Sequence, residues 1–284
     1  METPLATVPP PPLTFLQALR YCRDPRLVRF HFQHVRKVEE MLTLVTGQPI
    51  DAVRDVMAEI WRDDSFLGEL VGRHVFLTGR EPRGADFMFL TGVEGFPGRI
   101  MSEKAGSPFF HGQLLYSLVR LMEPDVVVET GGTPGNSSAF MLRAMDINRT
   151  GQLHTVDLPP QDKLEDYAGD GAWYHDAMPE EGGSGWAVPD HLRERHHQHL
   201  GDAKELLPGV LEQVGPVDVF IHDSDHSEAH MTWEFETGWP HIKPGGALLS
   251  DDIRANAAWD RFIQQQGLAD SKAGAFGAAR KPGP

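Results

Sequence analysis

Four aspartates lie in two clusters, each directly after a run of apolar residues. Asp223 and Asp225 follow VDVFIH, and Asp251 and Asp252 follow ALLS. Neighbouring strands of a sheet lie about 4.8 Å apart, so two such runs side by side would bring these oxygens together. Carboxylates that close repel one another unless a cation is present, and hard oxygen donors suit Mg²⁺, Mn²⁺ or Ca²⁺. The pattern favours a divalent-metal site.

Histidines accompany the first cluster and leave other interpretations open. His222 ends the apolar run, His226 follows Asp225, and His230 comes one helical turn later. An imidazole titrates near neutral pH and can act as a general base, whereas His226 and His230 at this spacing can also ligate a transition metal. The acids have a structural alternative too, in which Asp225 and Asp252 cap helices and the others face water.

A glycine-rich turn lies upstream, in DVVVETGGTPGNSSAFMLRAM at 125–145. The three consecutive valines predict a strand buried on both faces of a parallel sheet. Gly131, Gly132 and Gly135 let the chain turn sharply and approach a ligand closely. The polar residues at 136–138 predict a helix start, whose N–H groups attract polar or anionic ligand atoms. The segment therefore indicates a ligand site.

The spacing of this turn argues against a dinucleotide site. It reads E-x-G-x-x-x-G-x-S, and Thr130 stands where G-x-G-x-x-G has its first glycine. A pyrophosphate would also lie close to Glu129, so a nucleoside with a cationic tail fits better. A purely structural strand–turn–helix is the remaining alternative.

Two further acids follow predicted strands. Asp157 ends LHTVD, where a carboxylate can accept from both ribose hydroxyls, and Asp202 follows a strand predicted at 194–200, where it can accept from an adenine amine. Each residue alone is also explained as a helix cap. Together with Glu129 they place acids at three successive strand ends, which favours a nucleoside site.

With these residues the chain resembles the class I S-adenosylmethionine-dependent methyltransferases, over about residues 105–282. The resemblance implies an α/β, Rossmann-like fold with a mostly parallel, seven-stranded sheet, helices on both faces and an N-terminal helical cap. The segment FFHGQLLYSLVRLMEP resembles the helix that leads into the sheet in small-molecule O-methyltransferases. The residues that match the family's cofactor positions are Glu129, Gly131, Gly135 and Ser137 around the methionine moiety, Asp157 at the ribose and Asp202 at the adenine.

The aspartate clusters carry a narrower resemblance. D-S-D-H followed by D-D is similar to metal-dependent O-methyltransferases of the macrolide-sugar and macrocin type and to cephalosporin-hydroxylase-like proteins. The match implies that Asp223, Asp251 and Asp252 bind the metal, that Asp223 also borders the cofactor, and that His226 is the general base. Relatives often carry Glu at the position of Asp251.

These assignments predict an S-adenosylmethionine-dependent, divalent-metal-assisted O-methyltransferase acting on a hydroxyl of a small secondary metabolite. The metal, Mg²⁺ or else Mn²⁺ or Ca²⁺, would lower the pKa of the hydroxyl and hold it in line with the sulfonium methyl, and His226 would take the proton. The alternatives are a hydroxylase-like or non-methylating member of the same fold group, a nicotinamide-dependent oxidoreductase, and a catalytically idle binding module.

The composition agrees with small-molecule chemistry. The 284 residues are 40% hydrophobic and carry a formal net charge of −15 with scattered Lys and Arg, which argues against a nucleic-acid or anionic-membrane partner. The single cysteine, Cys22, excludes an internal disulfide and a cysteine-based zinc cluster. The first residues lack the order of a signal peptide, and no apolar run reaches the ~18 residues that span a bilayer. We expect a cytoplasmic protein.

Three regions are expected along the chain. Residues 1–12 contain a four-proline run and predict an extended arm. Residues 13–104 predict a helical cap, suited to a homodimer interface, and an irregular connection, and residues 105–284 predict the S-adenosylmethionine-binding catalytic domain. An insertion at 159–192 exceeds the usual connection length and predicts either a substrate lid or a disordered acidic loop. The later elements expected are strands at 217–222, 246–251 and 276–280, and a helix at 257–265.

Overall fold

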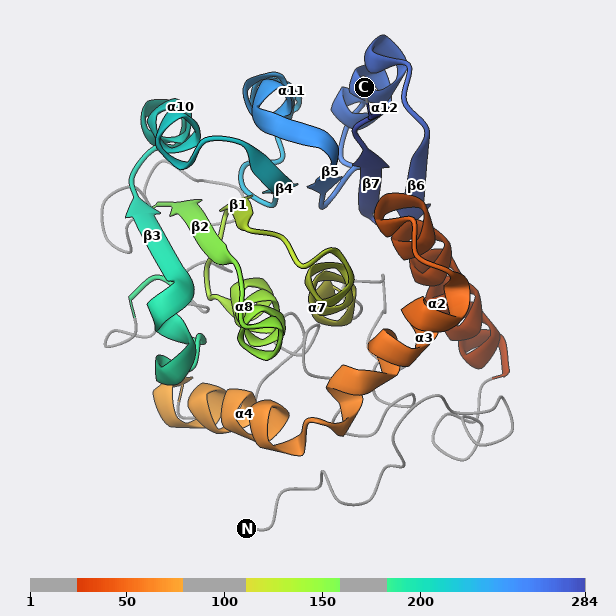
Figure 1. The fold of residues 1–284 in the computed structure, drawn as a ribbon, viewed down its shortest axis with the longest axis vertical. Helices are drawn as coiled ribbons and strands as arrows, with labels where there is room; N and C mark the ends of the chain where they lie inside the picture. The colour runs from red at the N-terminus through yellow and green to blue at the C-terminus, as the bar shows by residue number, and fades with distance from the viewer. Residues whose placement is uncertain (1–24, 79–110, 159–182, 284) are drawn as a thin grey trace.

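The computed structural model describes residues 25–78, 111–158 and 183–283 (Figure 1). The predicted arm at 1–12, the irregular connection before residue 105 and most of the insertion at 159–192 lie outside the described residues. The boundary predicted between the helical cap and the catalytic domain lies there as well, so the division into three regions stays a prediction.

A seven-stranded sheet has the strand order β3-β2-β1-β4-β5-β7-β6. The strands β1 to β5 run parallel, whereas β7 is antiparallel to both β5 and β6. The bounds are β1 Val126–Thr130, β2 Gln152–Asp157, β3 His196–Leu200, β4 Val217–His222, β5 Ile242–Ser250, β6 Asp270–Ala273 and β7 Phe276–Arg280. The predicted mostly parallel, seven-stranded sheet is confirmed.

Helices cover both faces of the sheet, as predicted (Figure 1). α7 and α8 lie on one face, and α10, α11 and α12 lie on the other. Their bounds are α7 His111–Met122, α8 Asn136–Asn148, α10 Ala203–Val214, α11 Glu228–Gly238 and α12 Ala258–Gln266, with short 3₁₀ turns η4 Asp190–Arg195 and η5 Trp239–His241. The segment FFHGQLLYSLVRLMEP does contain the helix that leads into β1.

The strands are buried on both faces because successive side chains point in opposite directions. In β1, Val127 belongs to the apolar cluster on the α7–α8 side, and Val128 belongs to the cluster on the α10–α12 side. In β4, Val219 and Phe220 divide in the same way. The consecutive valines that predicted a doubly covered strand are explained by this arrangement.

Three N-terminal helices form an arc outside α7 and α8 (Figure 1). They are α2 Pro25–Thr46, α3 Ile50–Glu59 and α4 Asp64–Thr78, with the 3₁₀ turn η2 Ile60–Arg62 between the last two. Their buried residues, among them Leu42, Val53 and Leu70, belong to the same apolar cluster as the inner residues of α7 and α8. The predicted helices in this part of the chain are therefore present and share the core of the sheet domain.

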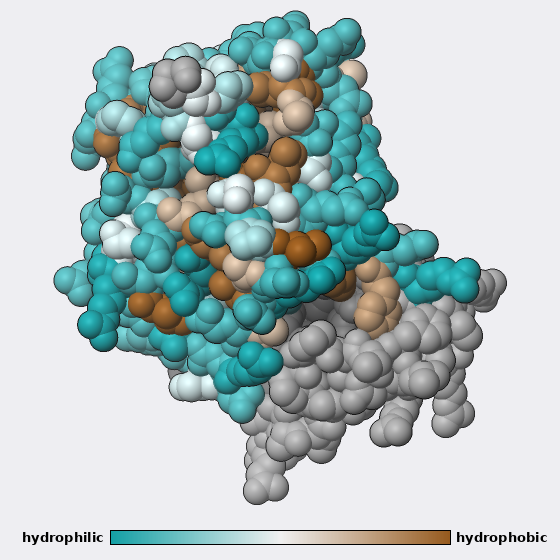
Figure 2. Space-filling model, turned by 45° about the vertical axis from the view of Figure 1, so that its right-hand side comes forward, coloured by the Kyte–Doolittle hydropathy of each residue, from teal (hydrophilic) through white to brown (hydrophobic). Residues whose placement is uncertain are grey.

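The described surface seen in Figure 2 is mainly hydrophilic, with apolar residues in smaller patches. Among the described residues, the large hydrophobic side chains that are exposed are Leu44, Ile50 and Leu200. None of the described helices has the length and apolar character needed to cross a membrane.

The side of the sheet to which the chain adds new strands switches between β1 and β4. The chain builds β2 and β3 outward on one side of β1, and β4 and β5 on the other. In parallel α/β sheets, ligands bind beyond the carboxyl ends of the strands at such a switch point. The acids singled out in the sequence follow these strand ends.

Candidate active site

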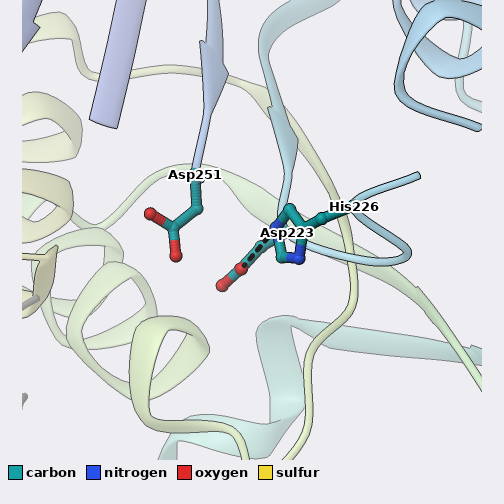
Figure 3. Close-up of side chains that lie close together, drawn as sticks. All are labelled: Asp223, His226 and Asp251. Carbon is teal, nitrogen blue, oxygen red and sulfur yellow. Dashed lines mark ion pairs between the residues drawn. The ribbon is translucent and has the colours of Figure 1, made fainter. Parts of the chain in front are cut away.

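Asp223, His226 and Asp251 lie together beyond the ends of β4 and β5 (Figure 3). One candidate ligand atom from each residue lies within 4.8 Å of the others, and His226 Nε2 lies 3.8 Å from Asp223 Oδ1. The carboxylates of Asp223 and Asp251 point towards the same space in Figure 3. Two carboxylates and an imidazole in this arrangement can hold a divalent cation.

The sheet itself sets the separation of the two aspartates. The last paired residues of β4 and β5 are His222 and Ser250, so the next residue of each strand is an aspartate. The ladder continues one step further, because Asp223 N donates to Thr130 O and Asp251 N donates to His222 O, both at 2.9 Å. The carboxylates of Asp223 and Asp251 therefore lie close together at the ends of two adjacent strands, as predicted.

Asp252 lies outside this three-residue group. Its backbone φ of 45° turns the chain away from the strand direction, and its side chain is 55% exposed. Asp252 Oδ2 lies 3.9 Å from His226 Nδ1, on the other nitrogen of the ring. The structure therefore brings His226, rather than Asp252, together with Asp223 and Asp251, and the metal-ligand role predicted for Asp252 stays a prediction.

The helix-cap alternative receives little support for these acids. The N-cap of α11 is Ser227, and Asp225 accepts from Ser227 N at 2.8 Å in the turn before it. Helix α12 begins at Ala258, well after Asp252. Asp225 thus shapes the turn, whereas Asp223 and Asp251 have no capping role among the described contacts.

The acids at this site repel one another and are partly removed from water. Burial, followed by the charges of Asp251 and Glu129, raises the pKa of Asp223 well above its usual value. Within the described residues, His226 Nε2 and Asp251 Oδ1 are buried and make no hydrogen bond. Burial, followed by the neighbouring His222, lowers the pKa of His226, so the ring is neutral at neutral pH. A bound cation would relieve the repulsion between the acids and would pair with these lone-pair atoms.

Glu129 is the buried acid at the end of β1. Its side chain is fully buried, and Ser137 Oγ and Ser138 Oγ donate to it at 2.5 and 2.6 Å. Burial raises the pKa of Glu129 to about 7, although the two serine hydrogen bonds act in the opposite direction. The predicted residues Glu129 and Ser137 are therefore in direct contact.

Asp157 and Asp202 have different local roles. Asp157 ends β2 and accepts from the Thr133 hydroxyl and from Leu158 N; burial raises its pKa to about 6. Asp202 is the N-cap of α10, and its Oδ1 accepts from Lys204 N at 2.8 Å. Because β3 lies beyond β2 in the sheet, Asp202 is the outermost of these acids.

Gly131 joins the glycine-rich turn to the aspartate cluster. Its φ is +80°, and a Cβ placed on it would lie 1.9 Å from the backbone oxygen of Asp223. Only glycine allows the two strand ends to approach this closely. The first turn and the second acid cluster, which lie far apart in the sequence, therefore form one continuous edge.

Replacing Gly131 with Ala should unfold this edge. We expect a loss of about 3 kcal/mol or more in the free energy of unfolding, because the new methyl group meets backbone atoms in a left-handed conformation. Urea unfolding measures the change. The matched control is Gly209→Ala in α10, where a Cβ meets nothing within 4 Å, and it should be neutral or stabilising by up to about 1 kcal/mol. Equal stability of the two variants would contradict the assigned close approach.

The comparison with family models identifies this region. Residues 128–253 match the model described as a methyltransferase domain. Over this region the chain is similar to methyltransferases. The match begins within β1 and ends just after Asp252, so it encloses the predicted acids from Glu129 onwards. The predicted resemblance to methyltransferases is confirmed for this region.

Short stretches of the chain are similar to curated O-methyltransferases. The mycinamicin VI 2''-O-methyltransferase of Micromonospora griseorubida is 34% identical over 73 residues, covering 26% of this chain and 18% of the relative. The demethylmacrocin O-methyltransferase of Streptomyces fradiae is 33% identical over 67 residues, covering 22% of this chain and 16% of the relative. The chain thus spans less than a fifth of the length of these relatives.

The chain also aligns with a solved structure. The O-methyltransferase TomG from Streptomyces achromogenes, determined in complex with SAM, aligns with a TM-score of 0.45 at 17% sequence identity. The alignment covers 78% of this chain and 92% of TomG.

Two residues that no sequence motif marks also lie near the aspartate cluster. His111 begins α7, and its Nε2 lies 3.5 Å from Asp251 Oδ1 while its ring packs on Phe276. Glu234 lies in α11 and bonds to His222 and Ser224, the two neighbours of Asp223. His111 is one of 14 histidines and Glu234 one of many helical acids, so neither carried a motif. Only the folded chain brings them to the site.

The described end of the predicted lid packs onto the glycine-rich turn. Trp186, Ala187 and Val188 are buried, Ala187 N donates to Pro134 O, and the Arg73 guanidinium donates to Trp186 O. The remainder of the insertion lies outside the described residues, so its role as a lid stays a prediction.

Proposed function

We propose that this protein is an S-adenosylmethionine-dependent O-methyltransferase that acts on a hydroxyl of a small molecule with the help of a divalent cation. The observation that carries the proposal is the contact at Gly131. This turn, which carries the predicted cofactor residues, lies directly against Asp223, so a methyl donor and an acceptor hydroxyl would meet at one edge. The homology to O-methyltransferases supports the same reaction class.

The cofactor assignments follow the strand ends. We propose that Glu129, with Ser137 behind it, faces the ammonium group of the methionine moiety, while Gly131 and Gly135 leave room for the cofactor backbone. Asp157 would accept from the ribose hydroxyls. Asp202 uses Oδ1 in the helix cap, so Oδ2 is the atom we assign to the adenine amine.

The residues present fit a divalent cation. Asp223 and Asp251 would hold it, and the resemblance adds Asp252. A bound Mg²⁺, Mn²⁺ or Ca²⁺ lowers the pKa of an adjacent hydroxyl. His226 is neutral at neutral pH, because its pKa is lowered, and its Nε2 faces the cluster, so it would take the hydroxyl proton. Asp252, near Nδ1, would then stabilise the protonated ring.

The test combines binding with product analysis. Calorimetry with S-adenosylmethionine should show binding, and incubation with polyhydroxylated acceptors and Mg²⁺ should yield a product heavier by one CH₂ together with S-adenosylhomocysteine. A product heavier by one oxygen would favour the hydroxylase-like alternative. Absence of binding would exclude the proposal, and turnover unaffected by chelators would exclude the cation.

Cofactor affinity should depend on pH through Glu129. Its pKa in the folded protein is about 7, so the carboxyl is mostly neutral at pH 6 and mostly ionised at pH 8. The ammonium of the cofactor favours the ionised form, so Glu129 alone should make S-adenosylhomocysteine bind about tenfold more weakly at pH 6 than at pH 8.

The variant Glu129→Gln isolates this effect in the same calorimetric titration. It should bind weakly at both pH values and retain only about a twofold dependence from Asp157, whose pKa is about 6. A wild-type affinity that does not change between pH 6 and pH 8 would remove Glu129 from the cofactor site.

The acceptor class, a homodimer built on the N-terminal helices and a cytoplasmic location complete the proposal. They rest on the resemblance and the composition set out above.

A further inference from the structure

Glu234 is a fully buried carboxylate on the α11 side of the sheet. Four side chains donate hydrogen bonds to it, two to each oxygen. Oε2 accepts from Thr130 Oγ1 at 2.5 Å and His222 Nδ1 at 2.6 Å, and Oε1 accepts from Ser224 Oγ at 2.7 Å and His230 Nε2 at 2.8 Å. Two acceptor positions on each oxygen are thereby used, so the acceptor capacity of the carboxylate is filled.

The charge on Glu234 is permanent over the working pH range. Burial alone would raise the pKa of this carboxyl, but the hydrogen bonds from His222 and His230 outweigh it and lower the pKa to about 2. A carboxylate accepts and cannot donate, so His222 carries its proton on Nδ1 and His230 on Nε2.

The four donors surround the residues assigned to the reaction. Thr130 directly precedes Gly131, while His222 and Ser224 directly precede and follow Asp223. The ring of His222 also meets the ring of His226 edge-on, with centroids 5.3 Å apart and planes at 80°. Glu234 thus accepts hydrogen bonds from the residues before and after Asp223. One of them, His222, also packs against the ring of His226.

Packing of α11 does not require this charge. Met231 and Phe235, from the same helix, are fully buried in the apolar cluster that covers this face of the sheet. Replacing a buried ionic group by apolar side chains is often neutral or stabilising. A network that contributes little to packing but holds the reacting strand end fits a role in the geometry of the site.

We propose that Glu234 is a positioning residue that fixes Asp223, which would hold the divalent cation, and His226, which would take the hydroxyl proton. The inference rests on the proposed function, because it assigns a purpose to the cation site. Glu234 itself touches neither the cation nor the acceptor; it acts through His222 and Ser224.

The test is Glu234→Gln, with Glu236→Gln as its matched control. Gln removes the charge and places an NH₂ group where two side chains now donate. The hydroxyl on that side must then rotate and the imidazole must change its tautomer, which weakens the hold of the network on the strand end. Glu236 lies on the same helix and is exposed. Mn²⁺ binding is measured by calorimetry without acceptor, S-adenosylhomocysteine binding is measured separately, and kcat and KM follow with the loaded enzyme.

For Glu234→Gln we expect the Kd for Mn²⁺ to rise at least tenfold and kcat to fall by a similar factor. The Kd for S-adenosylhomocysteine should change less than twofold, because Glu129 and Asp157 lie outside the network. Glu236→Gln should match the wild type in all three measurements. This split separates positioning from general destabilisation, which would weaken both ligands together.

Unchanged Mn²⁺ binding in Glu234→Gln, or equal losses of Mn²⁺ and S-adenosylhomocysteine binding, would overturn the inference.

Ser224→Ala is the second variant, to be used if Glu234→Gln does not fold. It removes a single donor at the partly exposed edge of the network, and it should raise the Kd for Mn²⁺ about threefold. No change in this Kd would equally overturn the inference. A wild-type protein that binds S-adenosylhomocysteine but no Mn²⁺ overturns the cation assignment and this inference together. A wild type that binds neither overturns the proposed function as a whole.

Discussion

Replacing Asp223 with Asn should lower kcat/KM for methyl transfer by about a thousandfold. Asp223 contributes a carboxyl oxygen to the group with His226 and Asp251, and Asn keeps the shape but cannot ionise to bind a cation. A cation at a reacting oxygen supplies several kcal/mol of charge stabilisation, and each 1.36 kcal/mol corresponds to a factor of ten in rate. Initial rates with saturating S-adenosylmethionine and varied acceptor give the ratio.

The control for this variant is Asp225→Asn, two residues away. Asp225 accepts from Ser227 N in the turn and lies outside the three-residue group, so its replacement should change kcat/KM by less than about tenfold. If Asp223→Asn and Asp225→Asn reduced activity equally, the loss would come from the turn and the assignment of Asp223 would fail.

Although Asp223→Asn should lower activity, we expect it to raise the stability of the folded protein. The pKa of Asp223 is raised in the folded protein, so above its ordinary pKa the ionised group opposes folding, and Asn removes that cost. Without divalent cations at neutral pH, the variant should unfold at a higher temperature than the wild type. Lost activity with gained stability distinguishes a functional acid from a structural one.

Replacing His226 with Gln should reduce kcat by about 10² to 10⁴, the usual contribution of a general base. The pKa of His226 is lowered by burial and by His222, so the wild-type rate should fall only as the pH drops below the ordinary histidine value of about 6.5. The kcat–pH profile measures both effects, and the acidic limb should disappear in His226→Gln.

His191 on η4 offers a control for the histidine variant. It is half-exposed and pairs with Glu69 at the surface, so His191→Gln should keep both the rate and the acidic limb. An acidic limb that persists in His226→Gln would assign the titration to another group and remove His226 as the base.

Strands could be predicted from the sequence where a run of apolar residues is buried on both faces of the sheet. β4 and β7 occupy the predicted ranges 217–222 and 276–280, because their apolar runs are covered on both faces. The element β6, Asp270–Ala273, was not predicted, since DSKA lacks a β-branched pattern and becomes a strand only by pairing with β7. Similarly, β5 begins at Ile242 rather than at residue 246. The additional residues include lysine, proline and glycine, which do not predict a strand, and the pairing with β4 is irregular between Val217 and Val219.

The positions of the site residues along the chain were likewise predictable. Glu129, Asp157, Asp223 and Asp251 all lie where strands of a parallel sheet end, and parallel strands bring such ends to one edge. The catalytic and binding roles of these residues remain proposals, for which the variants above are the test.

Strand propensity and side-chain alternation are local properties, so the order of residues along the chain was enough to predict that glycines and acids follow parallel strands. The tertiary structure alone decided which of these groups meet. The turn at Asp252 sends its carboxylate to the far side of His226, and α7 and α11 bring His111 and Glu234 to the strand ends from distant parts of the chain. Contacts of this kind depend on how helices pack across the sheet, and no spacing along the chain encodes them.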